Sequence, residues 1–194
     1  MNDKVEHWRN QTLVNRTRSN EMIATECYTL VKYIVENYKE RMETIQNPLL
    51  HLFSHCMELT YKDVNLYALS HSYINGNIGK TIHEHDLGKL SSMFVKLCRK
   101  LSQENCCSDE DKKIFENEII PNHIKLSKIL ATTTTTYRYI AKYDKNGNIK
   151  GKSVPFQNDN ESPNIQKLYP LFESCYFSAS WVLEILENFL QCPI

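Results

Sequence analysis

The sequence predicts a mostly α fold, an antiparallel helical bundle of about five helices with a β-hairpin inserted before the last helix. Apolar residues recur every three or four positions along most of the chain, which is the spacing of one helix face. One stretch rich in threonine and tyrosine interrupts this pattern and favours extended chain. A length of 194 residues suits one core, so we expect a single domain over residues 1–194.

Two helices are predicted in the first part of the chain. Helical spacing of apolar residues extends over residues 21–46. Asn47 and Pro48 then predict the start of a second helix, because Asn is a good N-cap and Pro lacks an N–H that the first helical position does not use. The stretch YINGNIGK, residues 73–80, predicts a loop after it.

Acidic and hydroxyl residues mark the next two helices. Asp86 is placed to cap a third helix that runs to about Gln103. Ser108, with Asp111 three residues later, predicts the start of a fourth helix. Pro121 should kink that helix or split it in two, because proline removes a helical hydrogen bond.

The hairpin is predicted over about residues 133–156, where threonines and tyrosines surround the turn signal NGN. Its arms would be residues 133–143 and 149–156. Ser162 and Pro163 then predict the start of a last, strongly apolar helix.

Charge and composition exclude several classes of protein. Lys plus Arg and Asp plus Glu are equal at 23 each, so no overall charge attracts nucleic acid or an anionic membrane. No apolar run approaches the roughly 18 residues of a membrane span, and the first residues lack a secretory signal. We therefore expect a cytoplasmic protein without a membrane partner.

The seven cysteines are expected to be free thiols. Four of them, Cys27, Cys56, Cys98 and Cys175, fall within apolar helical patterns and are predicted to be structural. The adjacent Cys106 and Cys107 have no CxxC partner, so the spacing of a zinc site is absent. We expect no metal and no cofactor.

A polar stripe lies within HLFSHCMELTYKD. His51, His55, Glu58 and Lys62 follow one another at steps of four, three and four, which places them on one helix face. One interpretation is a solvated face with a Glu58–Lys62 pair, worth roughly 0.2 to 0.5 kcal/mol. The other is the wall of a groove, in which imidazole transfers protons and a carboxylate orients it.

The sequence HEHD offers a second set of polar groups. His83, His85 and Asp86 lie just ahead of a predicted helix, where the unpaired amides of the first turn could also bind a phosphate. The simpler explanation is that Asp86 is an N-cap and the two histidines are loop residues. A His-Asp pair is also typical of HD metal phosphohydrolases, for which His55 and Asp144 would complete the set. Asp144, however, falls in the predicted hairpin turn rather than on a core helix.

In TYRYIAKY, Arg138 stands among three tyrosines, Tyr137, Tyr139 and Tyr143. Basic residues interleaved with aromatic ones can contact phosphates and stack on bases. Alternation of inward and outward residues on a half-buried hairpin predicts the same pattern.

Three motifs together resemble a bacterial branch of the HEPN superfamily, a group of all-helical domains associated with nucleotides and RNA. That branch has a proline-led helix reading roughly P-x-x-F-L-x-R-H-x-x-E-L-x-L-K, then H-D-L at a helix start, then an aromatic-Arg-Tyr hairpin. The resemblance covers about residues 20–190. The matching residues are Pro48, His55, Glu58, Leu59 and Lys62, then His85, Asp86 and Leu87, then Tyr137, Arg138 and Tyr139.

The resemblance implies a homodimer in phage defence or a toxin-antitoxin system, with an antitoxin or another defence protein as partner. An active member would be a metal-independent endoribonuclease, in which the 2′-hydroxyl attacks the adjacent phosphate. The roles implied are His85 as general base or acid, His55 as the complementary acid, Lys62 or Lys80 on the phosphate charge, and Glu58 and Asp86 as groups that orient the imidazoles. Contact with RNA or nucleotide is implied for Lys80, Tyr137, Arg138 and Tyr139.

The chain departs from the ribonuclease members at one motif. Those members have an Arg followed, after four to six residues, by a His, and no Arg here has that spacing. Ser54 stands where the branch commonly has Arg, while Lys80 precedes His85 at the right separation but lacks the guanidinium fork. The alternative is therefore a non-catalytic HEPN-like module that binds RNA, a nucleotide or a protein.

Overall fold

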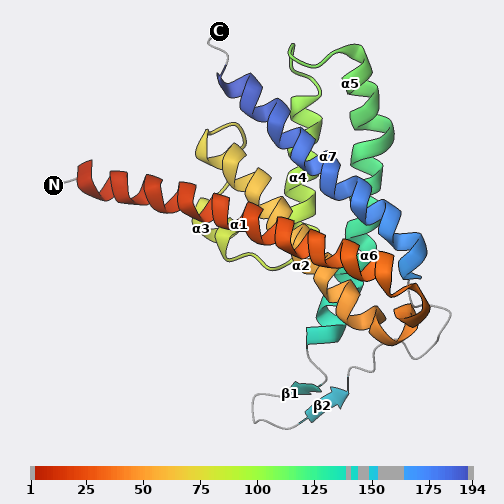
Figure 1. Ribbon diagram of the computed structural model, residues 1–194. Helices are drawn as coiled ribbons and strands as arrows, with labels where there is room; N and C mark the ends of the chain where they lie inside the picture. Colours follow the sequence, from red (N-terminus) through yellow and green to blue (C-terminus); the bar gives the residue numbers. More distant parts are fainter. Residues whose placement is uncertain (1–2, 139–140, 144–148, 153–163, 192–194) are drawn as a thin grey trace.

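The protein is mostly helical (Figure 1). In this computed structural model the backbone is described for residues 3–138, 141–143, 149–152 and 164–191, and side chains for residues 20–40, 45–130 and 164–191. The elements are α1 (Asp3–Asn37), the 3-10 helix η1 (Lys39–Arg41), α2 (Met42–Ser70), α3 (Ile78–Ile82), α4 (Leu87–Leu101), α5 (Asp109–Ile114), the π-helical segment η2 (Phe115–Ile119), α6 (Ile120–Arg138), β1 (Ala141–Tyr143), β2 (Ile149–Lys152) and α7 (Ile165–Gln191).

Helix α2 is the centre of the bundle. It contacts α1, α4, α6 and α7, which lie around it in Figure 1. Every residue from 56 to 66 is buried, whichever way its side chain points. A helix covered on all sides is usually apolar all round, so the polar residues of this stretch need specific partners.

The boundary between the first two helices differs from the prediction. The first helix ends at Asn37 and the second begins at Met42, so Asn47 is not an N-cap and Pro48 lies inside α2. Pro48 leaves one carbonyl of the preceding turn without its helical donor. Packing outweighs that local loss, because Ile45, before the proline, and Leu49, after it, both contribute to the core.

The predicted caps of the next two helices are confirmed. The Asp86 carboxylate accepts a hydrogen bond from Lys89 N at 3.1 Å and begins α4. Ser108 and Asp111 form a capping box at the start of α5. The interruption expected from Pro121 is the π-helical segment η2, which ends at Ile119, two residues before that proline.

The threonine-rich stretch is helical where a strand was predicted. Helix α6 continues to Arg138, so the first arm of the hairpin was wrong over residues 133–138. Threonine lowers helix propensity by only a few tenths of a kcal/mol, and extending an existing helix costs far less than starting one. The short strands β1 and β2 pair antiparallel, with Ala141 opposite Lys152, while the other residues of the predicted hairpin, 139–140, 144–148 and 153–156, lie outside the described residues.

Helix α7 closes the bundle against α2 and α6. Its first turn is capped by Asn164, whose Oδ1 accepts from Lys167 N at 3.1 Å. The predicted start, Ser162 and Pro163, lies outside the described residues. Phe172 of α7 stacks on Phe53 of α2 with ring centroids 4.3 Å apart, at the middle of the core.

The cysteines of the helical patterns pack in or beside the core. Cys56, Cys98 and Cys175 are buried free thiols, and Cys27 is half-buried against them. Burial raises the pKa of Cys175 to about 12, which keeps it a neutral, weakly reactive thiol. Among the described helices, none is long and apolar enough to cross a membrane.

Candidate functional site

The candidate site centres on the carboxylate of Glu58, in the buried part of α2. Lys62, one turn later, donates from Nζ to Glu58 Oε1 at 2.9 Å. Both side chains are only 7% exposed. Their partnership explains how two charged residues fit into the covered centre of the bundle, because each compensates the other's lost hydration.

His85 reaches the same carboxylate from the loop before α4. Its Nδ1 lies 2.9 Å from Glu58 Oε1, the oxygen that Lys62 also contacts. The His85 side chain is 61% exposed, and no hydrogen bond joins its Nε2 to a described residue. The imidazole is therefore held on one side by a buried carboxylate and open to solvent on the other.

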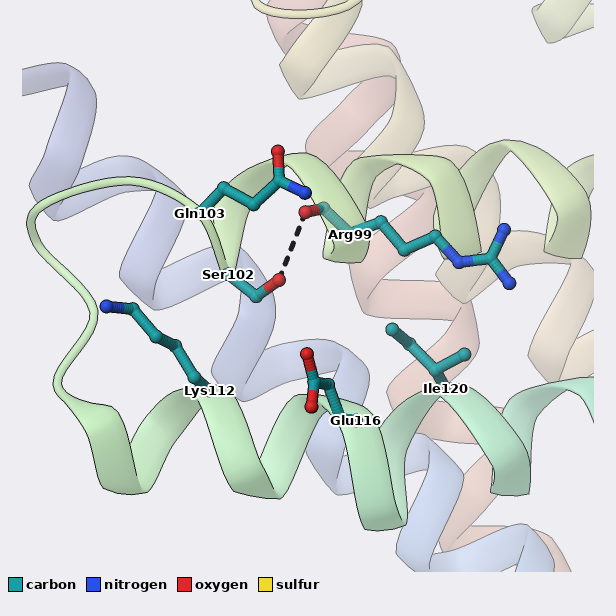
Figure 2. A pocket seen from close by; sticks show the side chains of 6 residues that line it. All are labelled: Arg99, Ser102, Gln103, Lys112, Glu116 and Ile120. Carbon is teal, nitrogen blue, oxygen red and sulfur yellow. Dashed lines mark hydrogen bonds between the residues drawn. The ribbon is translucent and has the colours of Figure 1, made fainter.

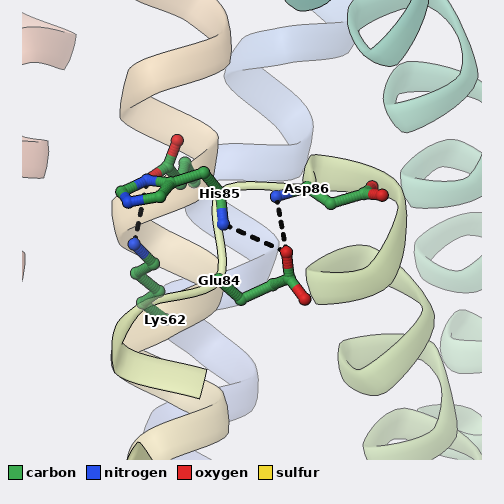
Figure 3. A network of polar contacts seen from close by, with 5 residues as sticks. Lys62, Glu84, His85 and Asp86 are labelled. Atoms are coloured by element: carbon green, nitrogen blue, oxygen red, sulfur yellow. Dashed lines mark hydrogen bonds and ion pairs between the residues drawn. The ribbon is translucent and has the colours of Figure 1, made fainter. Parts of the chain in front are cut away.

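Glu84 fixes the backbone of this loop. Its Oε1 accepts hydrogen bonds from the backbone N of Asp86 at 3.1 Å and of His85 at 3.2 Å (Figure 3). Its Oε2 lies 3.3 Å from Lys89 Nζ. The bond from Asp86 N is the main reason that the pKa of Glu84 is lowered. Glu84 thus closes a turn that aims the His85 side chain at α2.

Asp86 points away from this network. Figure 3 shows its side chain directed toward α4, opposite to the His85 ring. The carboxylate caps the helix through Lys89 N and lies 3.8 Å from Lys89 Nζ. Of the two explanations of HEHD, the N-cap describes what Asp86 does in the structure.

The polar stripe on α2 divides into two parts. His51 is exposed and His55 half-buried, whereas Glu58 and Lys62 are buried. A solvated face is therefore wrong for the last two residues. The structure brings together Glu58, Lys62 and His85, and it places His55 on the same face of α2, one turn before Glu58.

Of the four residues predicted to bind RNA, only Lys80 has a described side chain. Lys80 is exposed on α3, close in sequence to the His85 loop. Tyr137 and Arg138 are the last residues of α6, and their side chains lie outside the described part of the chain, as does Tyr139 altogether. Asp144, the last member of the phosphohydrolase set, also lies outside it.

Metal ligation has no support in the described residues, where no three His, Cys, Asp or Glu side chains are grouped so that they could hold an ion.

A second buried polar network, which was not predicted from the sequence, centres on His123. His123 of α6 is fully buried, with Nδ1 2.8 Å from Tyr61 Oη and Nε2 2.9 Å from Ser178 Oγ. Burial lowers the pKa of His123 to about 3, so the ring is neutral. A signal was available, because His123 stands between Ile119 and Leu126 at the spacing of the core face.

A groove lies between the end of α4 and the helix formed by α5, η2 and α6 (Figure 2). Its volume is about 650 Å³, and it is lined by Arg99, Ser102, Gln103, Lys112, Glu116 and Ile120. His85 lies two residues before Leu87, the first residue of α4. The 15 residues of α4 span about 22 Å. The groove is thus at the opposite end of α4 and is not part of the Glu58 site.

Comparisons of the chain with protein-family models, with curated proteins and with solved structures find no match.

Proposed function

We propose that this chain is a HEPN-like helical protein that cleaves RNA without a metal, with His85 as its general acid-base group. The observation that carries the proposal is the 2.9 Å contact between His85 Nδ1 and the buried Glu58 Oε1, in a histidine whose side chain is 61% exposed. The family part of the proposal rests on the three sequence motifs.

A carboxylate at Nδ1 determines what the rest of the ring can do. Glu58 accepts the Nδ1–H, so the lone pair of the neutral ring lies on Nε2, which faces solvent. In that tautomer Nε2 can remove the proton of a 2′-hydroxyl. The 2′-oxygen then forms a bond to the adjacent phosphorus, the bond from phosphorus to the 5′-oxygen breaks, and an acid protonates the leaving oxygen.

His55 is proposed as that acid, because it stands one turn before Glu58 on the same face of α2. The geometry favours Lys80 over Lys62 for the phosphate charge. Lys62 is buried and bonded to Glu58, whereas Lys80 is exposed. Lys62 instead balances the charge of Glu58, and Glu84 positions His85. Tyr137, Arg138 and Tyr139 are proposed to contact the RNA strand on the strength of the sequence motif.

We further propose the biological setting that the resemblance implies. This is a cytoplasmic homodimer in phage defence or a toxin-antitoxin system, restrained by an antitoxin or another defence protein.

The second candidate function is a non-catalytic HEPN-like module that binds RNA or a nucleotide. Position 54, where the branch commonly has Arg, is a serine that is 2% exposed, and its hydroxyl has no partner among the described residues. The side chain at this position is buried in the bundle, whereas the His85 side chain is exposed. Stabilisation by nucleotides or short RNAs without turnover would favour this module.

The proposal is tested by inducing the wild-type protein and a His85→Gln variant in a bacterial host, with growth and total-RNA integrity as readouts. His83→Gln is the matched control, because His83 is an exposed histidine of the same loop. We expect RNA fragmentation with the wild type and with His83→Gln but not with His85→Gln. Intact RNA in all three, with folding verified by circular dichroism, would favour the binding module.

A further inference from the structure

A small cavity of about 210 Å³ lies among α1, α2 and α7. The two outer helices both pack on α2 in Figure 1. Four carboxylates line it: Asp63 of α2, Glu21 of α1, and Glu184 and Glu187 of α7. No lysine or arginine is among its lining residues.

Asp63 is the deepest of these acids. It is 7% exposed, and its carboxylate makes no hydrogen bond or ion pair with any described residue. Burial, together with the charges of Glu21 and Glu187, raises its pKa to about 7. A carboxylate that is this buried normally has a protein partner, so the Asp63 oxygens depend on water or on a ligand that enters the cavity.

Three hydroxyls also line the cavity, and that of Tyr176 lies 3.2 Å from Thr25 Oγ1. Thr60 Oγ1 donates its proton to Cys56 O at 2.9 Å, and Ser180 Oγ donates to Tyr176 O at 3.3 Å. Their oxygen lone pairs remain for a donor, while Val64 and Leu183 supply apolar walls. An acidic cavity with apolar walls and no lysine or arginine suits an organic cation and rejects an anion.

We propose that this cavity binds a primary alkylammonium group, with the nitrogen on the Asp63 carboxylate and the methylene groups against Val64 and Leu183. Such a group belongs to a short free diamine or to a lysine side chain. Pockets for drug-sized molecules measure roughly 300 to 1,000 Å³. The cavity of about 210 Å³ is smaller than these, so it suits a ligand as small as an alkylammonium group.

The cavity is separate from the Glu58 site. Five residues along α2 turn Asp63 by about 140° from Glu58, so the two carboxylates face different neighbours. The proposal therefore does not depend on ribonuclease activity.

The test is isothermal titration calorimetry of the full chain with 1,4-diaminobutane at pH 8 and constant ionic strength. The neutral 1,4-butanediol is the ligand control. Nα-acetyl-lysine methylamide tests the lysine source, and Mg²⁺ tests a metal. Asp63→Asn removes the charge with little change in shape, and Glu110→Gln, an exposed acid on α5, is the matched control variant.

We expect saturable binding of the diamine or the lysine analogue, whichever source the cavity serves, and none of the diol. Asp63→Asn should weaken that binding at least tenfold, and Glu110→Gln should leave it unchanged. Amine binding should weaken from pH 8 to pH 6, because Asp63 takes up a proton over this range and loses its negative charge. The other acids that face the cavity are Glu21, Glu184 and Glu187.

Equal amine affinity in wild type and Asp63→Asn would overturn the proposal. Saturation by Mg²⁺ without binding of either amine would also overturn it, and so would the absence of binding by every ligand tested. Asp63→Asn is expected to fold, since it relieves repulsion from Glu21 and Glu187. If it does not fold, Glu187→Gln takes its place, and unchanged amine affinity in that variant would overturn the proposal.

Discussion

At the scale of single residues, Glu58 has a role both in the stability of the fold and in the proposed chemistry. Its carboxylate is buried where α2 is covered on all sides, and Lys62 and His85 both reach Oε1. Lys62 makes the buried charge tolerable, and His85 gains a fixed ring orientation from it. The two effects can be separated, because Lys62 is buried and His85 is exposed.

Removal of the lysine charge tests the structural half of this network. Lys62→Met leaves the Glu58 carboxylate without its ammonium partner, and we expect a loss of about 3 kcal/mol in the free energy of unfolding. Glu58→Gln alone should also destabilise the fold. The double variant should lose clearly less than the sum of the two. Urea unfolding of all four proteins measures this coupling, and strictly additive losses would show that the pair is not coupled.

The buried His123 should make the free energy of unfolding depend on pH. Its pKa is about 3 in the folded protein and about 6.5 in an unfolded chain. The folded state therefore binds fewer protons between these values, so the stabilising contribution is present above pH 6.5 and is lost as the pH falls. From pH 6.5 to pH 4 the loss should be about 3 kcal/mol.

Asp63 has the opposite effect on the pH dependence of stability in part of this pH range. Its raised pKa means that the folded state binds more protons from about pH 4 to 7, so its contribution is lost as the pH rises. The measurement is therefore made in an Asp63→Asn background, by urea unfolding with and without His123→Gln. The same acid sensitivity in both proteins would contradict the assignment to His123.

At the scale of elements, the turn before α4 positions the site. Glu84 accepts from two backbone N–H groups of this turn, those of His85 and Asp86. Glu84→Ala should free both, so their amide hydrogens should exchange faster, while the amides within α4 keep their protection. Unchanged exchange at residues 85 and 86 would show that Glu84 does not hold the turn. Asp86→Asn is the control, since asparagine is also a good N-cap.

The sequence predicted helix starts best where a side chain caps the turn to which it belongs. Asp86 and the Ser108–Asp111 box are such cases, because a cap is made by residues close in sequence. Asn47 and Pro48 carried the same kind of signal but lie inside α2, where packing on both sides of the proline overrides it. The threonines of α6 show the same override of a weak propensity.

At the scale of the whole molecule, the site depends on helix packing that spacing cannot reveal. The steps between His51, His55, Glu58 and Lys62 predicted one helix face, but which part of it is buried depends on α4, α6 and α7 around α2. The contact of His85 with Glu58 joins residues 27 positions apart. The acidic cavity at Asp63 likewise needs three helices that meet only in the fold.

The most direct test of the central claim is cleavage of a fluorescent single-stranded RNA by the purified protein in the presence of EDTA. A matched RNA with 2′-deoxyribose at every position is the substrate control, since it lacks the attacking hydroxyl. The wild type and His83→Gln should cleave the ribose substrate alone, and His85→Gln should be at least 100-fold slower with an unchanged melting temperature. Equal cleavage by His85→Gln and the wild type would contradict the assignment of His85 as the acid-base group.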